Sequence, residues 1–289
     1  MENDRLQPPT KVSEFYTTYA EESRLLTGAS RLEFERTKEL LSRVLPPPPA
    51  RVIDVGGAAG AYSFWLADLG YEVHLVDATP RLVEEARRQN DVRATPLASL
   101  RVGDARALPQ ERASADAVLL MGPLYHLVEE RDRLAAIAEA HRVLIPGGVV
   151  AVAAISRYAS ALAGLVHKLT RDPRFIEIRN RDLETGQHRN DTERLDFFTT
   201  SYFHRPEDLQ SELAAYFVEV QVLGIEGVGE WLIDFDERWN DPALRHELVD
   251  VARRLESEPS IIGMSAHLLG VGRKLDNTSQ GGATAVAER

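Results

Sequence analysis

Two carboxylates stand in or at the end of apolar runs, at a spacing that could form a nucleotide-binding site. Asp54 lies within the β-branched run 52–55, and Gly56, Gly57 and Gly60 come directly after it. Asp77 ends a second run 23 residues later. A strand, a glycine-rich turn and a helix make a crevice at the carboxyl end of a parallel strand, where glycine lets the backbone turn sharply and a ligand approach. An acid at the tip of the next strand can accept hydrogen bonds from both hydroxyls of a ribose. An ordinary strand-to-helix turn remains the alternative for the decapeptide 51–60 alone.

Two further apolar elements end in residues of the same kind. The third, 100–102, runs into Gly103-Asp104, and the fourth, 115–121, enters Gly122-Pro123-Leu124-Tyr125-His126-Leu127. The ordered set resembles the class I S-adenosylmethionine (SAM)-dependent methyltransferases of the small-molecule type. The resemblance covers residues 50–155 closely and 15–275 more loosely.

The resemblance implies SAM as cofactor and gives roles to particular residues. The glycines would lie under the amino-acid end and ribose, Asp77 would take the ribose hydroxyls, and Asp104 would accept from the adenine amino group. Ala58 stands where glycine is commoner in the motif. Asp104 could instead cap the segment after it, and Arg24 could clamp the SAM carboxylate or be an exposed helix arginine. The full set of candidate cofactor-binding residues is Tyr19, Arg24, Asp54, Gly56, Gly57, Gly60, Asp77, Ala78, Asp104, Ala105 and Met121.

His126 is the candidate catalytic residue, because it follows the fourth strand where donor and acceptor would meet. An unperturbed imidazole is mostly neutral at pH 7 and can accept a proton. The alternative is that His126 bonds a backbone carbonyl and shapes the loop. Pro123 is expected to prevent a continuous helix from the end of the strand. Methyl transfer from a sulfonium needs mainly positioning, water exclusion and removal of any proton on the acceptor. The candidate substrate-binding residues are Tyr125, Tyr158, Tyr202, His204 and Trp231. For Tyr202, His204 and Trp231 individually, core packing or a surface position is the favoured alternative.

The elements needed to position these residues alternate along the chain. Apolar patterns predict strands near 51–55, 72–76, 98–102, 115–120 and 148–154, with helices near 60–69, 80–89 and 130–144. Two more strands are expected at 217–223 and 265–272. Alternation of this kind predicts an α/β fold: a Rossmann-like, seven-stranded, mostly parallel sheet with helices on both faces.

Segments outside this core suggest additions to it. Residues 1–48 are expected to form an N-terminal helical lid that ends at four prolines, and 49–275 the methyltransferase domain. Within that domain, 156–200 and 224–263 are expected to be cap insertions, the first with a helix at 158–170 and a polar segment at 179–194. A mobile surface excursion is the alternative for the first. Residues 276–289 are expected to be a disordered tail.

Composition limits the partners. The net charge is −11 without a basic run, which disfavours a nucleic-acid substrate. The absence of cysteine excludes disulfides, cysteine-ligated zinc and cysteine nucleophiles, and no metal site is expected. No apolar stretch reaches the length of a membrane span or signal-peptide core, so a cytoplasmic protein without membrane contact is expected. A homodimer is left open.

The sequence therefore favours a SAM-dependent methyltransferase that acts on O, N or C of a small molecule, with specialised metabolism as a conceivable setting. A NAD-dependent oxidoreductase is the alternative within the enzyme class. It is weakened because Gly56, Ala58 and Ala61 stand at the three glycine positions of its motif. A SAM-binding protein without turnover is the alternative from another class.

Overall fold

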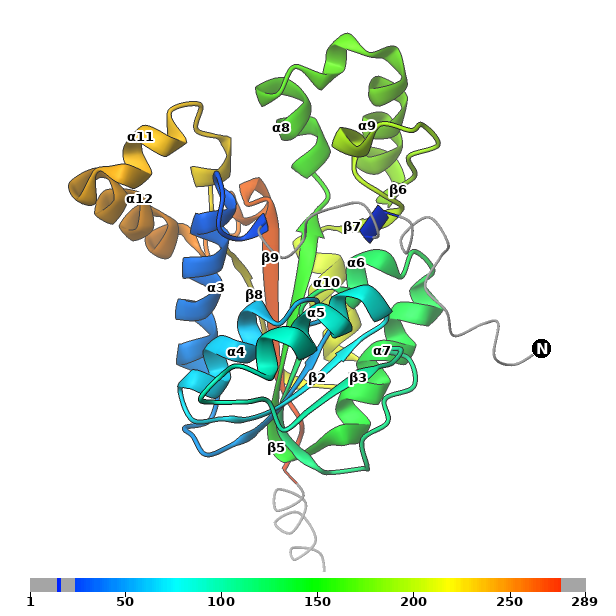
Figure 1. Cartoon of the computed structure of the whole chain (residues 1–289). Helices are drawn as coiled ribbons and strands as arrows, with labels where there is room; N and C mark the ends of the chain where they lie inside the picture. The colour runs from blue at the N-terminus through cyan, green and yellow to red at the C-terminus, as the bar shows by residue number, and fades with distance from the viewer. Residues whose placement is uncertain (1–14, 17–23, 277–289) are drawn as a thin grey trace, which may run out of the picture.

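Five strands form the parallel centre of the sheet in the computed structural model, which describes residues 15–16 and 24–276. Because all neighbouring pairs among them are parallel, their carboxyl ends meet at one edge of the sheet, at the upper end in Figure 1. In spatial order they are β3 (Ser99–Val102), β2 (Glu72–Asp77), β1 (Arg51–Val55), β4 (Ala115–Leu120) and β5 (Leu144–Ser156).

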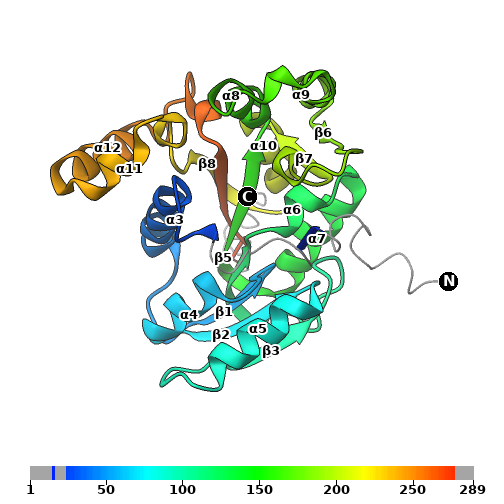
Figure 2. The same cartoon turned by 45° about the horizontal axis from the view of Figure 1, so that its top comes forward.

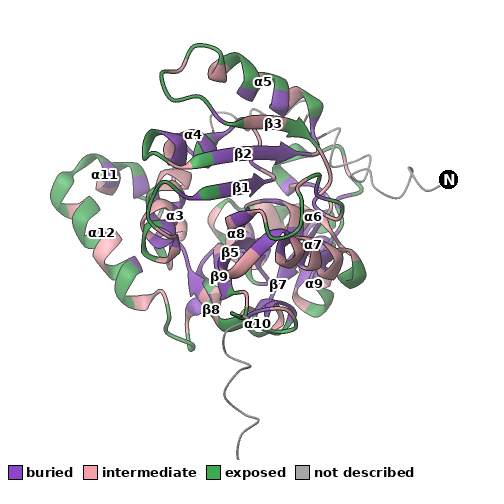
Figure 3. Cartoon of the chain, turned by 90° about the horizontal axis from the view of Figure 1, so that it is seen from below, coloured by how far each residue is buried: buried purple, intermediate pink, exposed green. Residues whose placement is uncertain are grey.

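Helices cover both faces of this sheet, as expected. Alternate residues of β1 face opposite ways: Val52 packs with one set of helices and Ile53 with the other. The first set is α3 (Ser30–Val44), α4 (Ala61–Asp68) and α5 (Pro80–Asn90). The second is α6 (Pro123–His126), α7 (Glu130–Val143) and α10 (Pro206–Ala214). Burial on both faces explains why β1 and β2 are almost wholly buried in Figure 3.

Two antiparallel strands complete the core. The strand β9 (His267–Arg273) pairs with β5, and β8 (Val218–Gly224) pairs with β9. Both lie within a residue or two of the predicted ranges. The seven strands expected from the sequence are thus present in a mixed, mostly parallel sheet with helices on both faces, and the predicted fold class is confirmed.

The whole sheet has nine strands, because the segment after β5 contributes two that were not predicted. They are β6 (Gln187–His188) and β7 (Ser201–His204), and β7 pairs with the end of β5. Strands of two and four residues carry too little alternation to be recognised as a pattern. The seven predicted strands therefore form the core, and the two short strands bring the whole sheet to nine.

The first insertion also contains more helix than expected. It comprises α8 (Ala159–Val166), η2 (Leu169–Arg171), α9 (Pro173–Thr185) and η3 (Leu195–Phe197), and it stands above the carboxyl edge of the sheet (Figure 1). Much of the predicted polar segment is the second half of α9. Asp172 caps this helix by accepting from the Arg174 amide, and Gly186 ends it in the left-handed conformation. The charged residues of this polar segment lie on the exposed side of α9, and few residues of the helix are buried.

The second insertion packs beside α3. It comprises η4 (Gly229–Trp231), α11 (Phe235–Asn240), α12 (Pro242–Leu255) and η5 (Ile262–Met264), with α11 and α12 next to α3 in Figures 1 and 2. Leu32 of α3 packs in an apolar cluster with Phe235, Trp239 and Leu248. The wholly buried Arg36 pairs with Glu256 just beyond α12. Helix α3 therefore joins this insertion to the core.

The N-terminal lid and the tail are only partly open to description. Helix α3 lies within the segment 1–48 that was expected to be helical. Residues 1–14 and 17–23, which include Tyr19, lie outside the described residues, as does the tail from residue 277. None of the helices in the described part of the chain is both long and apolar enough to cross a membrane.

Candidate active site

The loop after β1 lies at the centre of the carboxyl edge. Gly56 and Gly60 adopt left-handed φ angles of 76° and 94°, and Ala58 between them adopts 48°. A Cβ atom on Gly56 would lie 2.5 Å from Cδ of Pro123, so only glycine allows the loops after β1 and β4 to approach this closely. Ala58 takes the place of glycine and is tied down, because its amide donates to Oδ2 of Asp77 at 2.9 Å.

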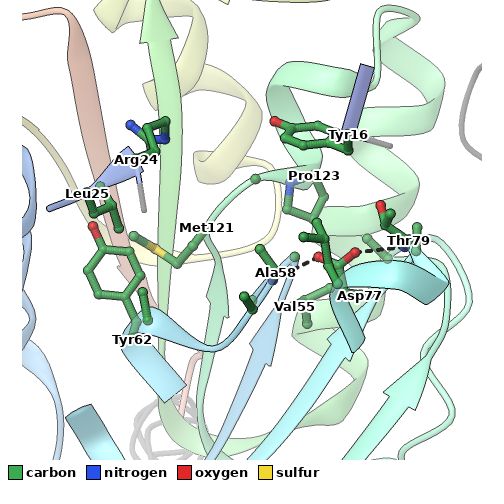
Figure 4. Close-up of a pocket in the computed structure, with 18 of the residues that line it drawn as sticks. Tyr16, Arg24, Leu25, Val55, Ala58, Tyr62, Asp77, Thr79, Met121 and Pro123 are labelled. Atoms are coloured by element: carbon green, nitrogen blue, oxygen red, sulfur yellow. Dashed lines mark hydrogen bonds between the residues drawn. The ribbon is translucent and has the colours of Figure 1, made fainter. Parts of the chain in front are cut away.

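Asp77 connects this loop to the end of β2. Its Oδ1 accepts from the Thr79 amide at 2.7 Å, so both carboxylate oxygens hold backbone N–H groups (Figure 4). Each oxygen keeps a second lone pair, and the side chain lines the cavity above the loop. Burial raises the pKa of Asp77, and its backbone hydrogen bonds oppose that rise.

Asp54 lies beneath the loop and does not reach the cavity. It is fully buried, and its Oδ2 accepts from Ser63 Oγ of α4 at 2.6 Å. Burial raises the pKa of its carboxyl to about 6, and Oδ1 has no hydrogen-bond partner among the described residues. Asp54 was a candidate cofactor-binding residue, but its hydrogen bond is to the protein, beneath the loop. Gly60 likewise begins α4 and does not face the cavity.

A cavity of about 460 Å³ opens above these strand ends. A volume in this range suits a cofactor or a small ligand. The candidate residues that line it are Arg24, Gly56, Gly57, Asp77, Ala78, Asp104, Ala105, Met121, Tyr125 and His126. Segments from four strand ends and from the region before α3 therefore meet around a single space.

Asp104 is engaged by its own neighbour. Arg106 donates to both of its carboxylate oxygens, at 2.9 and 2.7 Å, and the Arg106 amide donates to Oδ1. Arg106 also reaches Asp132 of α7. The turn-capping role considered from the sequence is thus present, while the carboxylate still borders the cavity.

Sequence reasoning missed several apolar residues of the cavity wall. Tyr62, Phe64 and Trp65 of α4 line the cavity, together with Leu25 and Phe34. Tyr62, Phe64 and Trp65 fall in the helix predicted near 60–69, and no ligand contact was predicted for them. The available signal was their position directly after the glycine loop, where the first turn of a helix borders any ligand.

His126 contacts Tyr16 at the far end of the cavity. Its Nδ1 lies 3.4 Å from the carbonyl oxygen of Thr200, which can only accept, so Nδ1 carries the proton. Nε2 is then the acceptor, and the Tyr16 hydroxyl donates to it at 2.9 Å. Burial lowers the pKa of His126 to about 4, and the weak bond to Thr200 offsets only part of this shift. Figure 4 shows Tyr16 over Pro123, whose single-turn helix α6 begins at the proline and carries His126.

Arg24 lies on the other side of the cavity entrance. Its guanidinium donates to both oxygens of Glu33, at 2.6 and 3.0 Å, and it borders the cavity above Met121 (Figure 4). The exposed helix arginine considered from the sequence does not describe it, since the side chain is mostly covered.

A second cavity of about 220 Å³ adjoins the first beneath α8 and α9. Tyr16, Arg24 and Tyr125 border both spaces, and Trp231 lines only the second. Tyr125 and Trp231 are thus the two candidate substrate residues that the structure brings to a cavity.

The remaining three candidate substrate residues lie elsewhere. Tyr202 stacks beneath the Arg133 guanidinium at 3.7 Å, and the fully buried His204 bonds Glu212 of α10 at 3.3 Å. Their strand, β7, turns these side chains towards α7 and α10. Tyr158 packs over Gly263 and borders a separate surface groove. The prediction that these three line the acceptor pocket is not supported by their positions.

Fold and site geometry both bear on the class of protein. The sheet order β3-β2-β1-β4-β5, an antiparallel β9 beside β5, and a cavity over the loop after β1 make a Rossmann-like core with a ligand-sized space at its carboxyl edge. Solved structures agree with this fold. A SAM-dependent methyltransferase of Methanosarcina mazei has a TM-score of 0.55 at 17% identity, over 82% of this chain and 97% of that one. The PH0226 protein of Pyrococcus horikoshii has a TM-score of 0.58 at 18% identity, over 90% and 98%.

Sequence comparison supports the same class. Residues 52–148 match the family model described as a methyltransferase domain. A ubiquinone biosynthesis O-methyltransferase of Xanthomonas axonopodis pv. citri (strain 306) is 35% identical over 126 residues, which are 43% of this chain and 51% of that protein. The chain thus matches about half the length of this relative. Residues 52–148 are thus similar to a methyltransferase domain, and the chain has the fold of solved SAM-dependent methyltransferases.

Proposed function

We propose that this chain transfers a methyl group from SAM to an O, N or C atom of a small molecule. The observation that carries the proposal is the shared cavity: Asp77 and the glycine loop border one side, and His126 borders the side next to the second cavity. One space can thus bring a cofactor and a proton acceptor together. The acidic net charge and the small size of the second cavity suit a compact acceptor better than a polymer.

The residues around the first cavity fit the cofactor. The loop presents backbone without side chains at Gly56 and Gly57, and Asp77 retains acceptor capacity for two hydroxyls. Met121 lies beside the loop for the methionine part, and Asp104 and Ala105 border the adenine end in this assignment. When bound, SAM supplies an activated methyl group on a sulfonium. The protein then has to orient the acceptor, exclude water and accept a proton.

His126 is the residue we assign to the proton. Its neutral state and its Nδ1–H tautomer leave Nε2 as the accepting atom. The Tyr16 hydroxyl occupies that atom, so an acceptor hydroxyl or amine would replace the phenol as donor to Nε2. An acceptor that is already nucleophilic needs only the positioning.

The test is a binding screen followed by turnover. Calorimetric titration should show binding of SAM and S-adenosylhomocysteine and none of NAD. Mass spectrometry of a panel of alcohols, amines and carbon acids incubated with SAM should then reveal methylated product. Tight binding of NAD would favour the oxidoreductase. SAM binding without turnover on any acceptor class would favour the non-catalytic alternative.

We also propose that the chain acts in the cytoplasm, that its methyl acceptor is a small molecule and that it has no nucleic-acid partner. The oligomeric state, monomer or homodimer, is measured by light scattering of the purified chain.

A further inference from the structure

The second cavity has an apolar wall. Five aromatic side chains from the first insertion, β7 and η4 line it: Phe175, Phe197, Phe198, Phe203 and Trp231. Ile155, Ala159 and Ala163 add aliphatic surface. Such a wall favours a compact apolar body, with affinity coming from removal of its surface from water.

A group of five ionisable side chains closes one end of this cavity; Glu33 and Glu226 are buried, and Arg24, Glu230 and His267 are half-buried. Arg24 forks onto Glu33, and His267 Nδ1 donates to Oε1 of Glu226. Glu226 Oε2 also accepts from Ser265 Oγ at 2.7 Å and from the His267 amide at 3.1 Å. In each of these two pairs, the positive charge of the cation offsets the negative charge of the carboxylate.

Glu230 is the fifth member, and its charge is not balanced by the two pairs. It borders the cavity from η4, and its Oε2 is fully buried with no hydrogen-bond partner in the described part of the chain. Burial, followed by the nearby Glu226, raises the pKa of Glu230 to about 8. Burying a carboxyl oxygen without a partner is costly, so a site with this arrangement gains most from a ligand that supplies the missing donor.

Of the other titratable groups that the first insertion brings to the cavity wall, His167 is exposed, and His188 and Asp196 are engaged within the insertion. His188 Nδ1 lies 2.9 Å from Asp182, and its Nε2 donates to the carbonyl of Phe197. Asp196 is paired with Arg194. Glu230 is therefore the group of the wall best placed to select a ligand by charge.

We propose that the second cavity binds the methyl acceptor and selects a cationic amine on a compact apolar body, whose ammonium group pairs with Glu230. An ammonium group supplies both the missing donor and the opposite charge, and the aromatic side chains take the rest of the molecule. The identification of the ligand as the acceptor rests on the proposed methyltransferase function. The amine selectivity itself does not.

The experiment is a calorimetric titration of the full chain, saturated with S-adenosylhomocysteine, with 2-phenylethylamine, 2-phenylethanol and 3-phenylpropanoate. We expect the amine to bind at least about tenfold more tightly than the alcohol, and the carboxylate most weakly. Titration at pH 7 in two buffers of different ionisation enthalpy should show proton release on amine binding, because the ammonium ionises Glu230. Glu230→Gln should abolish both the preference and the proton release.

Glu237→Gln is the matched control, because Glu237 is exposed on α11 in the same insertion. It should leave the preference and proton release intact. Equal binding of amine and alcohol, a preference for the carboxylate, or an unchanged preference in Glu230→Gln would overturn the proposal. The proposal would also be overturned if no amine between ethylamine and indole-3-ethylamine in size bound with a Kd of about 1 mM or lower.

A protonated Glu230 that donates to a neutral ligand would be indicated by tighter binding of phenylacetone than of the amine, and this result would also overturn the proposal. Failure of the methyltransferase function appears separately. In that case S-adenosylhomocysteine would not bind, or no methylated product would form. The amine preference does not depend on either result, because it can be measured with the same chain in the absence of cofactor.

Discussion

Asp77 holds the loop after β1 through the amides of Ala58 and Thr79, and its remaining lone pairs face the first cavity. Each charge-assisted bond to a ribose hydroxyl is worth on the order of 1.5–3 kcal/mol, so Asp77→Ala should weaken SAM binding tenfold or more. Calorimetric titration measures this loss. Glu84→Ala, an exposed change on α5, should bind SAM like the wild type.

Loss of the ribose bonds can be separated from disturbance of the loop. A 2′,3′-dideoxy analogue of S-adenosylhomocysteine lacks the hydroxyls, so Asp77→Ala should weaken its binding much less than that of the parent. Equal losses for the two ligands would assign Asp77 to the loop alone. Unchanged SAM affinity in Asp77→Ala would falsify the ribose assignment.

His126 accepts the hydroxyl of Tyr16 at the boundary of the two cavities. Glutamine keeps approximate size and hydrogen bonding but cannot take the proton. His126→Gln should leave SAM affinity near wild type and lower turnover about 10²-fold. Tyr16→Phe is the matched comparison, because it removes the donor to Nε2 and leaves the imidazole; it should keep most of the activity.

The pH profile gives a second measure of the same residue. Since the pKa of His126 is lowered to about 4, the imidazole is neutral at every pH above about 5, and its contribution to kcat should be flat from pH 6 to 8. An inflection near 6.5 that disappears in His126→Gln would show a base with an ordinary pKa. Full turnover in His126→Gln would leave positioning as the main source of rate.

At the scale of elements, the first insertion stands over the edge where the cavities open (Figure 1). Its contacts with the N-terminal segment include Phe198 against Phe15, with ring centroids 5.5 Å apart. We expect residues 156–200 and the segment around Tyr16 and Tyr19 to close over bound ligands and exclude water.

Hydrogen exchange followed by mass spectrometry tests this closure. Exchange should slow in both segments when S-adenosylhomocysteine and an acceptor are present together, while α12, which packs beside α3, serves as an internal reference. If neither segment gains protection, the insertion is surface structure and the closure hypothesis is wrong.

At the scale of the whole molecule, the ionisable cluster should make stability depend on pH. Burial opposes the charged form of His267, but Glu33 and Glu226 outweigh it and raise its pKa to about 9. A raised pKa stabilises the fold fully below the unfolded value near 6.5, and this contribution is lost as pH rises through about 9. The pKa of Glu230, raised to about 8, acts in the same direction: its carboxyl favours the fold while protonated, and folding loses stability as pH rises from 4.5 to 8.

Thermal unfolding between pH 6 and pH 9.5 should therefore show a falling Tm. Glu230→Gln should raise the Tm at pH 9 relative to the wild type, by at least about 2 °C, and flatten the curve. Glu237→Gln should follow the wild-type curve. A Tm that is lower in Glu230→Gln at pH 9 would mean that the ionised carboxylate has a stabilising partner in the fold.

Sequence alone determined the core strands and the loops between them, because those features depend on local patterns. A buried parallel strand is a short β-branched run, and the turn after β1 needs glycine where φ is positive, so both can be recognised within a few residues. The same local reasoning placed Asp77, Met121 and His126 at strand ends that meet at one edge. It could not distinguish Asp54, which lies under the loop, from a residue that faces the cavity.

Only the tertiary structure decided which distant segments meet. Tyr16 reaches His126 across 110 residues of sequence, and Glu33, Glu226, Glu230 and His267 form one cluster from α3, the turn after β8, η4 and β9. It also turned Tyr202 and His204 towards Arg133 and Glu212, away from both cavities. Such contacts depend on how insertions pack onto the core, since no local period of the sequence encodes the distance between residues 200 positions apart.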